Sequence, residues 1–183
     1  VEVGAAVSIE DFGNILISEY PELREWLKRF GGPQVRCSGT VGGNIANGSP
    51  IGDSSPVLIA LGASLKLGSR HAERIIPIED FFIEYGEQDL HLDEVLVSVL
   101  VPRRKNIKRL VVEKISKRYD QDISIVLAAM VEFSSGLSRY RFAFGGMAGT
   151  PALARKTMES LNPDDLALDF SPLSDHRAEA WYR

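Results

Sequence analysis

The sequence predicts an α+β fold, on three observations. Two amphipathic helical patterns lie within the first 30 residues, strand patterns follow from residue 63 onward, and no internal repeat is visible. Apolar residues make up 44% of the 183 residues and charged residues 25%, which is typical of a globular chain. This length suffices for one ordinary domain, or for two small lobes around a buried core.

The first elements are two helices. The segment Ser8-Ile9-Glu10-Asp11 resembles a capping box, and apolar residues follow it at helical spacing. A second helix is expected from Pro21, because proline is favoured in a first turn. Its apolar residues lie at i, i+3, i+4 and i+7 and therefore share one face: Leu23, Trp26, Leu27 and Phe30. The segment 31–33, Gly-Gly-Pro, ends this helix.

The middle of the chain predicts one more helix and two strands. Ser54-Ser55-Pro56 is a helix start, and Gly62 marks its end. Alternation from Ala63 to Leu67 indicates a half-buried strand, and residues 80–82 a short turn or helix. The segment 95–101 is apolar on both faces, which is typical of a central strand, and Pro102 closes it.

A basic segment, residues 103–109, is expected to connect two lobes, so we predict a first unit over 1–102 and a small α+β lobe over 109–183. The second unit is expected to hold a strand at 110–114, a helix or strand at 123–133, a turn at 134–136 and a strand at 140–144. Thr150-Pro151 is expected to cap a helix running to Leu161.

Composition limits the classes of function. The net charge of −4 argues against nucleic acid as the main partner. A single cysteine, Cys37, leaves no internal disulfide and favours a reducing compartment. The longest apolar run, 123–133, is short of the ~20 residues of a membrane helix. We therefore expect a soluble, cytoplasmic protein. The chain starts without methionine, within what looks like a strand, so we also expect a fragment.

The segment 40–53, Thr-Val-Gly-Gly-Asn-Ile-Ala-Asn-Gly-Ser-Pro-Ile-Gly-Asp, is the strongest candidate for a binding site. Its paired glycines could take positive φ, and successive N–H groups in such a turn can converge on an anion. Asp53 adds a carboxylate suited to ribose or ribityl hydroxyls. The spacing equally fits a tight turn and bulge between strands. It is neither a Walker loop nor a Rossmann glycine motif.

Five blocks in order carry a resemblance to a known family. They are the segments 30–53, 81–85, 114–124 and 143–148, and the tail 169–183 with Asp175, Arg177, Tyr182 and Arg183. Together they resemble the FAD domain of the xanthine dehydrogenase family, most closely its bacterial enzymes with separate subunits. The resemblance implies the C-terminal part of a vanillyl-alcohol-oxidase/CO-dehydrogenase-flavoprotein-type FAD-binding domain, followed by the small lobe.

The resemblance also implies site residues. The turn 40–44 is similar to the family's second FAD loop, and Asp53 to a family FAD ligand. Phe30 is similar to an aromatic residue beside the flavin ring, Leu96 to an aliphatic flavin contact, and Tyr85 to a tyrosine near the nicotinamide pocket. The full set of expected cofactor residues is Phe30, Thr40, Val41, Gly42, Gly43, Asn44, Ser49, Gly52, Asp53, Leu96 and Lys114. No catalytic acid, base or nucleophile is expected, because the cofactor carries the chemistry.

By the same resemblance, the chain would take electrons from [2Fe–2S] clusters through FAD to NAD⁺ in an enzyme oxidising hypoxanthine or xanthine. Its partners would be an iron–sulfur domain or subunit and a molybdopterin-binding subunit. The family's first FAD loop lies upstream of Val1, so we expect this fragment alone to hold FAD poorly. Alternatives are the FAD subunit of another molybdenum hydroxylase, acting on aldehydes, N-heterocycles or carbon monoxide, and a nucleotide-binding assembly module without redox activity.

Several residues also have an ordinary interpretation. Cys37 would be a small packed residue, and Lys114 a solvated lysine on a strand. Phe30 would belong to the core, and the segment 145–147 would be the end of a strand. The three histidines, His71, His91 and His176, are expected at the surface, because metal sites need clustered ligands.

Overall fold

The computed structural model describes residues 1–135 and 139–183, so Gly136 of the expected turn 134–136 lies outside it. The helices are α1 (Ile9–Glu19), α2 (Arg24–Arg29), α3 (Pro33–Ser38), α4 (Val41–Ala46), α5 (Ser54–Leu61), α6 (Arg155–Ser160) and α7 (Leu166–Asp169). The strands are β1 (Glu2–Gly4), β2 (Ser64–Gly68), β3 (Glu73–Pro77), β4 (Phe82–Glu84), β5 (Glu87–Gln88), β6 (Val95–Leu100), β7 (Ile107–Ile115), β8 (Val126–Phe133), β9 (Tyr140–Gly145) and β10 (Ala152–Leu153). Single turns of 3-10 helix occur at 21–23, 78–80, 163–165 and 180–182.

The strands form two antiparallel sheets of four strands each and one short hairpin. The first sheet has the order β1-β6-β2-β3 and the second β10-β9-β8-β7, while β4 pairs with β5. Val99 of β6 lies between Val3 and Leu65, so the central position predicted for this strand is confirmed. Val95 and Val97 are exposed, however, and the expectation of two apolar buried faces is wrong. An antiparallel sheet needs only one buried face.

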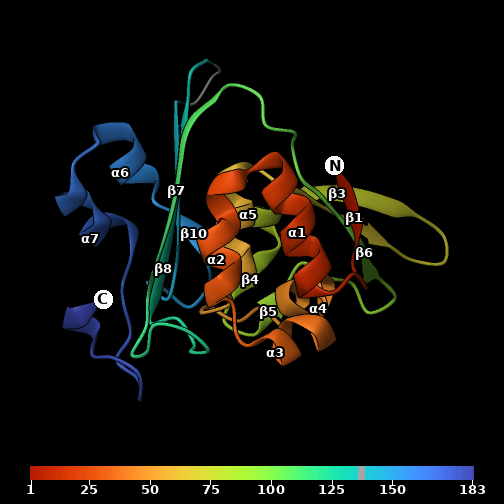
Figure 1. The fold of residues 1–183 in the computed structure, drawn as a ribbon, viewed down its shortest axis with the longest axis horizontal. Coiled ribbons are helices and arrows are strands. Elements are labelled where there is room, and N and C mark those ends of the chain that lie inside the picture. The colour runs from red at the N-terminus through yellow and green to blue at the C-terminus, as the bar shows by residue number, and fades with distance from the viewer. Residues whose placement is uncertain (136–138) are drawn as a thin grey trace.

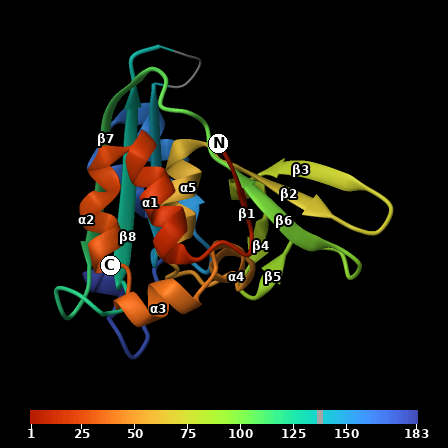
Figure 2. The same ribbon diagram turned by 45° about the vertical axis from the view of Figure 1, so that its right-hand side comes forward.

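Helices fill the space between the two sheets. In Figures 1 and 2, α1, α2 and α5 lie between the β7–β8 side and the β1–β6 side, and the β2–β3 hairpin projects away from them. Every residue of α5 is buried, because its sequence is apolar around the whole helix. Arg141 of β9 donates from Nη2 to the carbonyl of Ile59 on α5 at 2.8 Å. One core joins both sheets, so the division at 102–109 stays a prediction.

The α+β class and the first helices are as predicted. Ser8 caps α1 by accepting from the Asp11 N–H at 3.1 Å. Gly31, at φ +53°, follows α2, and Gly62, at φ +72°, ends α5, both in the left-handed region that glycine tolerates. In the segment that was open between helix and strand, 123–133, residues 126–133 form strand β8. None of the helices in the described ranges combines the length and the apolar character needed to cross a membrane.

Two expectations about local structure are wrong. The expected turn 40–44 opens helix α4 (Val41–Ala46), and neither Gly42 nor Gly43 has positive φ. The expected helix 150–161 starts only at Arg155, because Ala152 and Leu153 pair with Phe144 and Ala143 as strand β10. This pairing is a tertiary contact that the local pattern does not contain.

Candidate functional site

A cleft of 520 Å³ lies where three segments distant in sequence meet. The end of α2 and the start of α3 supply Phe30, Gly31, Gly32, Gln34 and Val35. The stretch from α4 to α5 supplies Asn44, Asn47, Ser49, Ile51, Gly52 and Asp53. The β7–β8 connection supplies Gln121, Asp122 and Ile123. The volume is in the range of small-molecule sites, about 300–1,000 Å³.

A buried ion pair joins these three walls. Lys114 Nζ lies 2.6 Å from Asp53 Oδ2, and the two side chains are only 3% and 8% exposed. The same ammonium donates to the carbonyl of Arg29 at 2.9 Å and to that of Asp122 at 2.8 Å. Ser124 Oγ donates to Asp53 Oδ1 at 2.5 Å. Each wall therefore contributes an acceptor to one ammonium, and the interpretation of Lys114 as a solvated lysine is wrong.

Asp53 keeps acceptor capacity toward the cleft. A carboxylate has about four lone-pair sites, and Lys114 and Ser124 use two of them. Trp26 donates from Nε1 to the backbone carbonyl of Asp53 at 3.2 Å, and this hydrogen bond holds the backbone of Asp53 in place. Asp53 therefore lines the cleft with lone pairs that none of these contacts uses.

The turn 40–44 is stabilised by protein contacts and does not form an anion nest. Val41 N donates to Val7 O, Gly42 N to Ala5 O and Gly43 N to Thr40 Oγ1, at 3.0, 2.9 and 3.1 Å. A Cβ at Gly42 would lie 2.5 Å from that of Ala5, so close packing requires this glycine. The N–H groups that were expected to converge on a phosphate are satisfied within the protein.

Asn44 is the residue of this turn that lines the cleft. Its Oδ1 atom is buried and has no hydrogen-bond partner among the described residues. Buried side-chain oxygens in proteins are nearly always paired. The amide oxygen is therefore open to a donor group from outside the described residues.

The structure gathers some of the predicted cofactor residues and separates others. Phe30, Asn44, Ser49, Gly52 and Asp53 line the cleft, and Lys114 lies directly behind Asp53. Phe30 also packs edge to face on Trp26 at 5.6 Å between ring centroids, so it belongs to the core as well. The residues that lie outside the described lining are Thr40, Val41, Gly42, Gly43 and Leu96, the last of which pairs with Leu67 in the first sheet.

Sequence reasoning did not assign the third wall of the cleft. Gln121 has φ +49°, a conformation uncommon for a residue with a side chain, and it lines the cleft. Asp122 accepts from the backbone N–H of Arg118, which lowers the pKa of its carboxyl. The sequence signal for this wall was the run of adjacent charges in segment 117–122, and such a run by itself indicates only a charge-paired turn. Cys37 on α3 is exposed, so its interpretation as a packed residue is wrong.

A second cleft, of 380 Å³, adjoins the first, and Ser49 and Ile51 line both. Tyr85, in the β4–β5 turn, lines the second cleft with a 76% exposed side chain. Gly146, at φ +83°, also lines the second cleft. We expected it only to end a strand, and it directly follows β9. The tail residues 173–177 and Arg183 form the opposite side.

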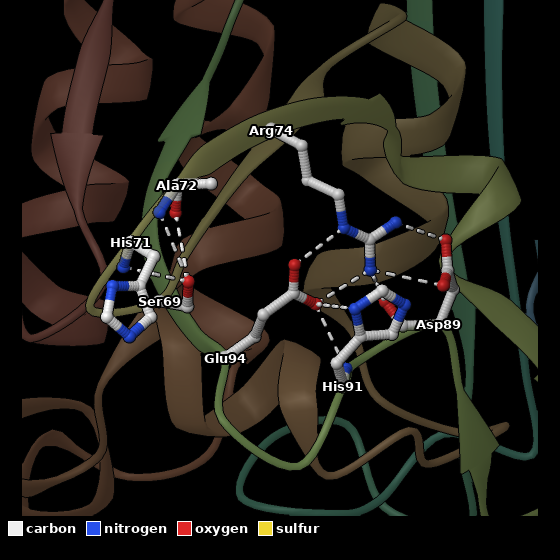
Figure 3. Close-up of polar contacts among 7 residues, drawn as sticks. All are labelled: Ser69, His71, Ala72, Arg74, Asp89, His91 and Glu94. Carbon is white, nitrogen blue, oxygen red and sulfur yellow. Dashed lines mark hydrogen bonds and ion pairs between the residues drawn. The ribbon is translucent and has the colours of Figure 1, made fainter.

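A polar cluster anchors the segment that follows the β4–β5 hairpin. Arg74 on β3 donates to both carboxylate oxygens of Asp89 and of Glu94 at 2.7–3.1 Å (Figure 3). Arg74 holds the pKa of Glu94 down to about 2, because it donates to that carboxylate. Both acids are held by one guanidinium, which identifies the cluster as a structural clamp. His91, next to Glu94, and His71, whose backbone N–H donates to Ser69 apart from the clamp, are both exposed, as expected.

The fold and the cleft together define a two-sheet α+β ligand-binding domain, whose site forms between three segments distant in sequence. Residues 1–104 match the family described as the FAD binding domain in molybdopterin dehydrogenase. Residues 113–167 match the CO dehydrogenase flavoprotein C-terminal domain. The chain therefore belongs to the family of FAD-binding domains of molybdopterin dehydrogenases.

Relatives and solved structures agree with this assignment. The chain is 35% identical over 177 residues to the xanthine dehydrogenase/oxidase of Gallus gallus, and 32% identical over 179 residues to xanthine dehydrogenase 1 of Arabidopsis thaliana. Each match covers 88% of this chain but 13% of the relative. Among structures, CO dehydrogenase chains from Oligotropha carboxidovorans and Hydrogenophaga pseudoflava are 25% and 28% identical, each with a TM-score of 0.86 over 99% of this chain and 68% of theirs.

Proposed function

We propose that this chain is the FAD-binding electron-transfer module of a xanthine dehydrogenase. In this proposal it takes electrons from [2Fe–2S] centres and passes them through FAD to NAD⁺, while a molybdopterin-binding partner oxidises hypoxanthine or xanthine. The names of the relatives support the enzyme class. A cytoplasmic location belongs to the same proposal and is supported by the single cysteine.

The observation that carries the proposal is the set of unsatisfied acceptors in the first cleft. Asn44 Oδ1 is buried and unpaired, and Asp53 retains lone pairs beside it. Ser49 adds a hydroxyl, and Phe30 an aromatic ring, to the same lining. Acceptors next to an apolar ring suit a ligand that carries both hydroxyl groups and a flat ring, and FAD has both. These residues would hold the hydroxyl-bearing and ring portions of FAD.

FAD supplies the redox chemistry when it is bound. The chain contributes binding and orientation. The Lys114 ammonium fixes the relative positions of Arg29, Asp53 and Asp122, and thus the shape of the cleft. Because the ion pair neutralises the ammonium, the wall behind the cleft carries little net charge.

A second candidate is the FAD subunit of another molybdenum hydroxylase. It is supported by the two CO dehydrogenase structures, which share nearly the whole fold of this chain. In both candidates the residues that line the first cleft would contact FAD and not the substrate of the molybdopterin-binding partner. They therefore do not distinguish an enzyme acting on a purine from one acting on carbon monoxide. An assembly module without redox activity would lack flavin altogether.

Reconstitution with FAD tests the proposal. The purified chain, together with its natural flanking sequence, should bind FAD and show flavin absorbance. In the assembled enzyme, Phe30→Ala should slow NAD⁺ reduction and leave purine oxidation with an artificial dye nearly unchanged, because hydride transfer needs close approach of the two rings. A colourless protein after reconstitution would exclude the flavin function. Equal losses with NAD⁺ and dye would make Phe30 a core residue only.

A further inference from the structure

Arg177 carries a positive charge that no described residue balances. Arg177 lines the second cleft and also a neighbouring cleft that includes Lys117, and its Nε atom is buried without a hydrogen-bond partner in the ranges 1–135 and 139–183. Within the same ranges, its guanidinium forms no ion pair within 4.0 Å. A buried N–H donor without an acceptor is costly, and a bound anion would supply one.

The acid nearest in sequence is engaged elsewhere. Asp175, which also lines the second cleft, accepts from Arg183 Nη2 at 2.8 Å. Its other oxygen accepts from the backbone N–H groups of Arg177 and Ala178 at 2.8 and 3.1 Å. The contact with Arg183 lowers the pKa of Asp175 to about 2, so it stays ionised and paired. Arg177 therefore leaves the cleft with an excess positive charge.

The first cleft does not provide such a site. Its described lining holds acceptors and no lysine or arginine, and Lys114, behind Asp53, is paired with that carboxylate. The N–H groups at the start of α4 are satisfied by Ala5, Val7 and Thr40. A ligand that carries both hydroxyl groups and phosphates would therefore find acceptors in the first cleft and a cation only in the adjoining one.

We propose that Arg177 binds the diphosphate of a dinucleotide in the second cleft, an inference that rests on the proposed function. A planar guanidinium matches phosphate oxygens through two parallel hydrogen bonds. Tyr85, on the same cleft, offers an exposed ring on which a base or ring of the ligand can stack. Ser49 and Ile51 line both clefts, so the two clefts adjoin. The diphosphate belongs either to FAD or to an exchanging NAD⁺.

Three variants of the chain, each carrying its natural flanking sequence as in the reconstitution above, test this site. Arg177→Gln removes the charge and keeps a polar side chain of related length, while Arg177→Lys keeps the charge without the planar fork. Lys117→Gln is the matched control, because Lys117 is an exposed cation on a neighbouring cleft that contacts the carbonyl of His176. Calorimetric titrations measure affinity for FAD and for inorganic pyrophosphate with the apo-protein, and for NAD⁺ with the FAD-loaded protein.

Arg177→Gln should weaken the affinity for pyrophosphate and for one of the two dinucleotides roughly ten- to a hundredfold. Arg177→Lys should recover part of this loss, and Lys117→Gln should lose little. A loss confined to the FAD titration assigns the diphosphate to FAD, and a loss confined to NAD⁺ assigns it to NAD⁺. Unchanged affinities in all three titrations, or an equal loss in Lys117→Gln, would overturn the proposal. If the wild-type chain bound no FAD, the proposed function would fail, while the pyrophosphate titration would still decide on Arg177.

Discussion

Asp53 and Lys114 lie 61 residues apart in the sequence and form an ion pair of 2.6 Å inside the protein. Asp53 precedes α5 between the sheets, and Lys114 lies near the end of β7 in the second sheet. Both were expected to contact FAD directly. In the structure they contact each other, and of the two only Asp53 lines the first cleft. The pair therefore connects the stability of the fold to the shape of the site.

We predict that Lys114→Met lowers the free energy of unfolding by about 3–5 kcal/mol, because it leaves the Asp53 carboxylate buried without its partner. The double variant Asp53→Asn/Lys114→Met should lose clearly less than the sum of the two single variants, since it removes both charges. Urea denaturation of the apo-protein measures these values. The control is Lys108→Met, whose exposed pair with Glu132 should contribute at most about 1 kcal/mol. Strict additivity of the two single variants would contradict the coupling.

We predict that Gly42 and Gly43 differ in their tolerance of a side chain. Gly42→Ala should destabilise the apo-protein by about 1–3 kcal/mol, because its Cβ would lie 2.5 Å from that of Ala5 and 2.8 Å from the Ala5 carbonyl. Gly43→Ala should destabilise the protein less than Gly42→Ala, because its one close contact is the side-chain oxygen of Thr40, whose displacement weakens only the cap of α4, and alanine favours a helix. Thermal melts distinguish the two. Equal destabilisation would show that the two positions have the same environment.

We predict that Asn44→Ala weakens FAD binding without destabilising the apo-protein. The Asn44 Oδ1 atom has no protein partner to lose, whereas a hydrogen bond to the ligand contributes about 0.5–1.5 kcal/mol, or roughly two- to tenfold in affinity. Flavin fluorescence titration and a melting curve measure the two effects. Asn14→Ala, at an exposed position of α1, serves as the control and should change neither. A fall in melting temperature with unchanged FAD affinity would assign Asn44 to the fold alone.

We predict that the Arg74 clamp loses its stabilising effect in acid. The pKa of Glu94 lies at about 2 in the folded chain, below its ordinary value of 4.5, and the pKa of Asp89 is lowered by the same guanidinium. Because folding lowers both pKa values, the stabilisation is fully present above the ordinary values and is lost as the pH falls toward 2. The stability difference between wild type and Arg74→Met should therefore shrink from pH 5 to pH 2. A difference that stays constant over this window would mean that Arg74 acts through packing.

The sequence by itself determined the local elements whose signals are short-range. The capping residue Ser8, the apolar face of Leu23 to Phe30 and the αL position of Gly62 depend on neighbours within a few residues. The family also followed from the sequence, because five ordered blocks carry it. The candidate site could be predicted in part, and five of the expected residues line the first cleft.

Only the tertiary structure decided which of these residues act together. The partner of Lys114 is 61 residues away, the third wall comes from the β7–β8 connection, and β10 exists only because β9 offers it a pairing edge. In the sequence, Gly42 resembles a glycine of a phosphate-binding loop. In the structure, a glycine is required there because Ala5 packs too closely to leave room for a side chain. Burial and charge pairing depend on distances in space that neither spacing nor composition encodes, and so the unbalanced charge of Arg177 became visible only in the folded chain.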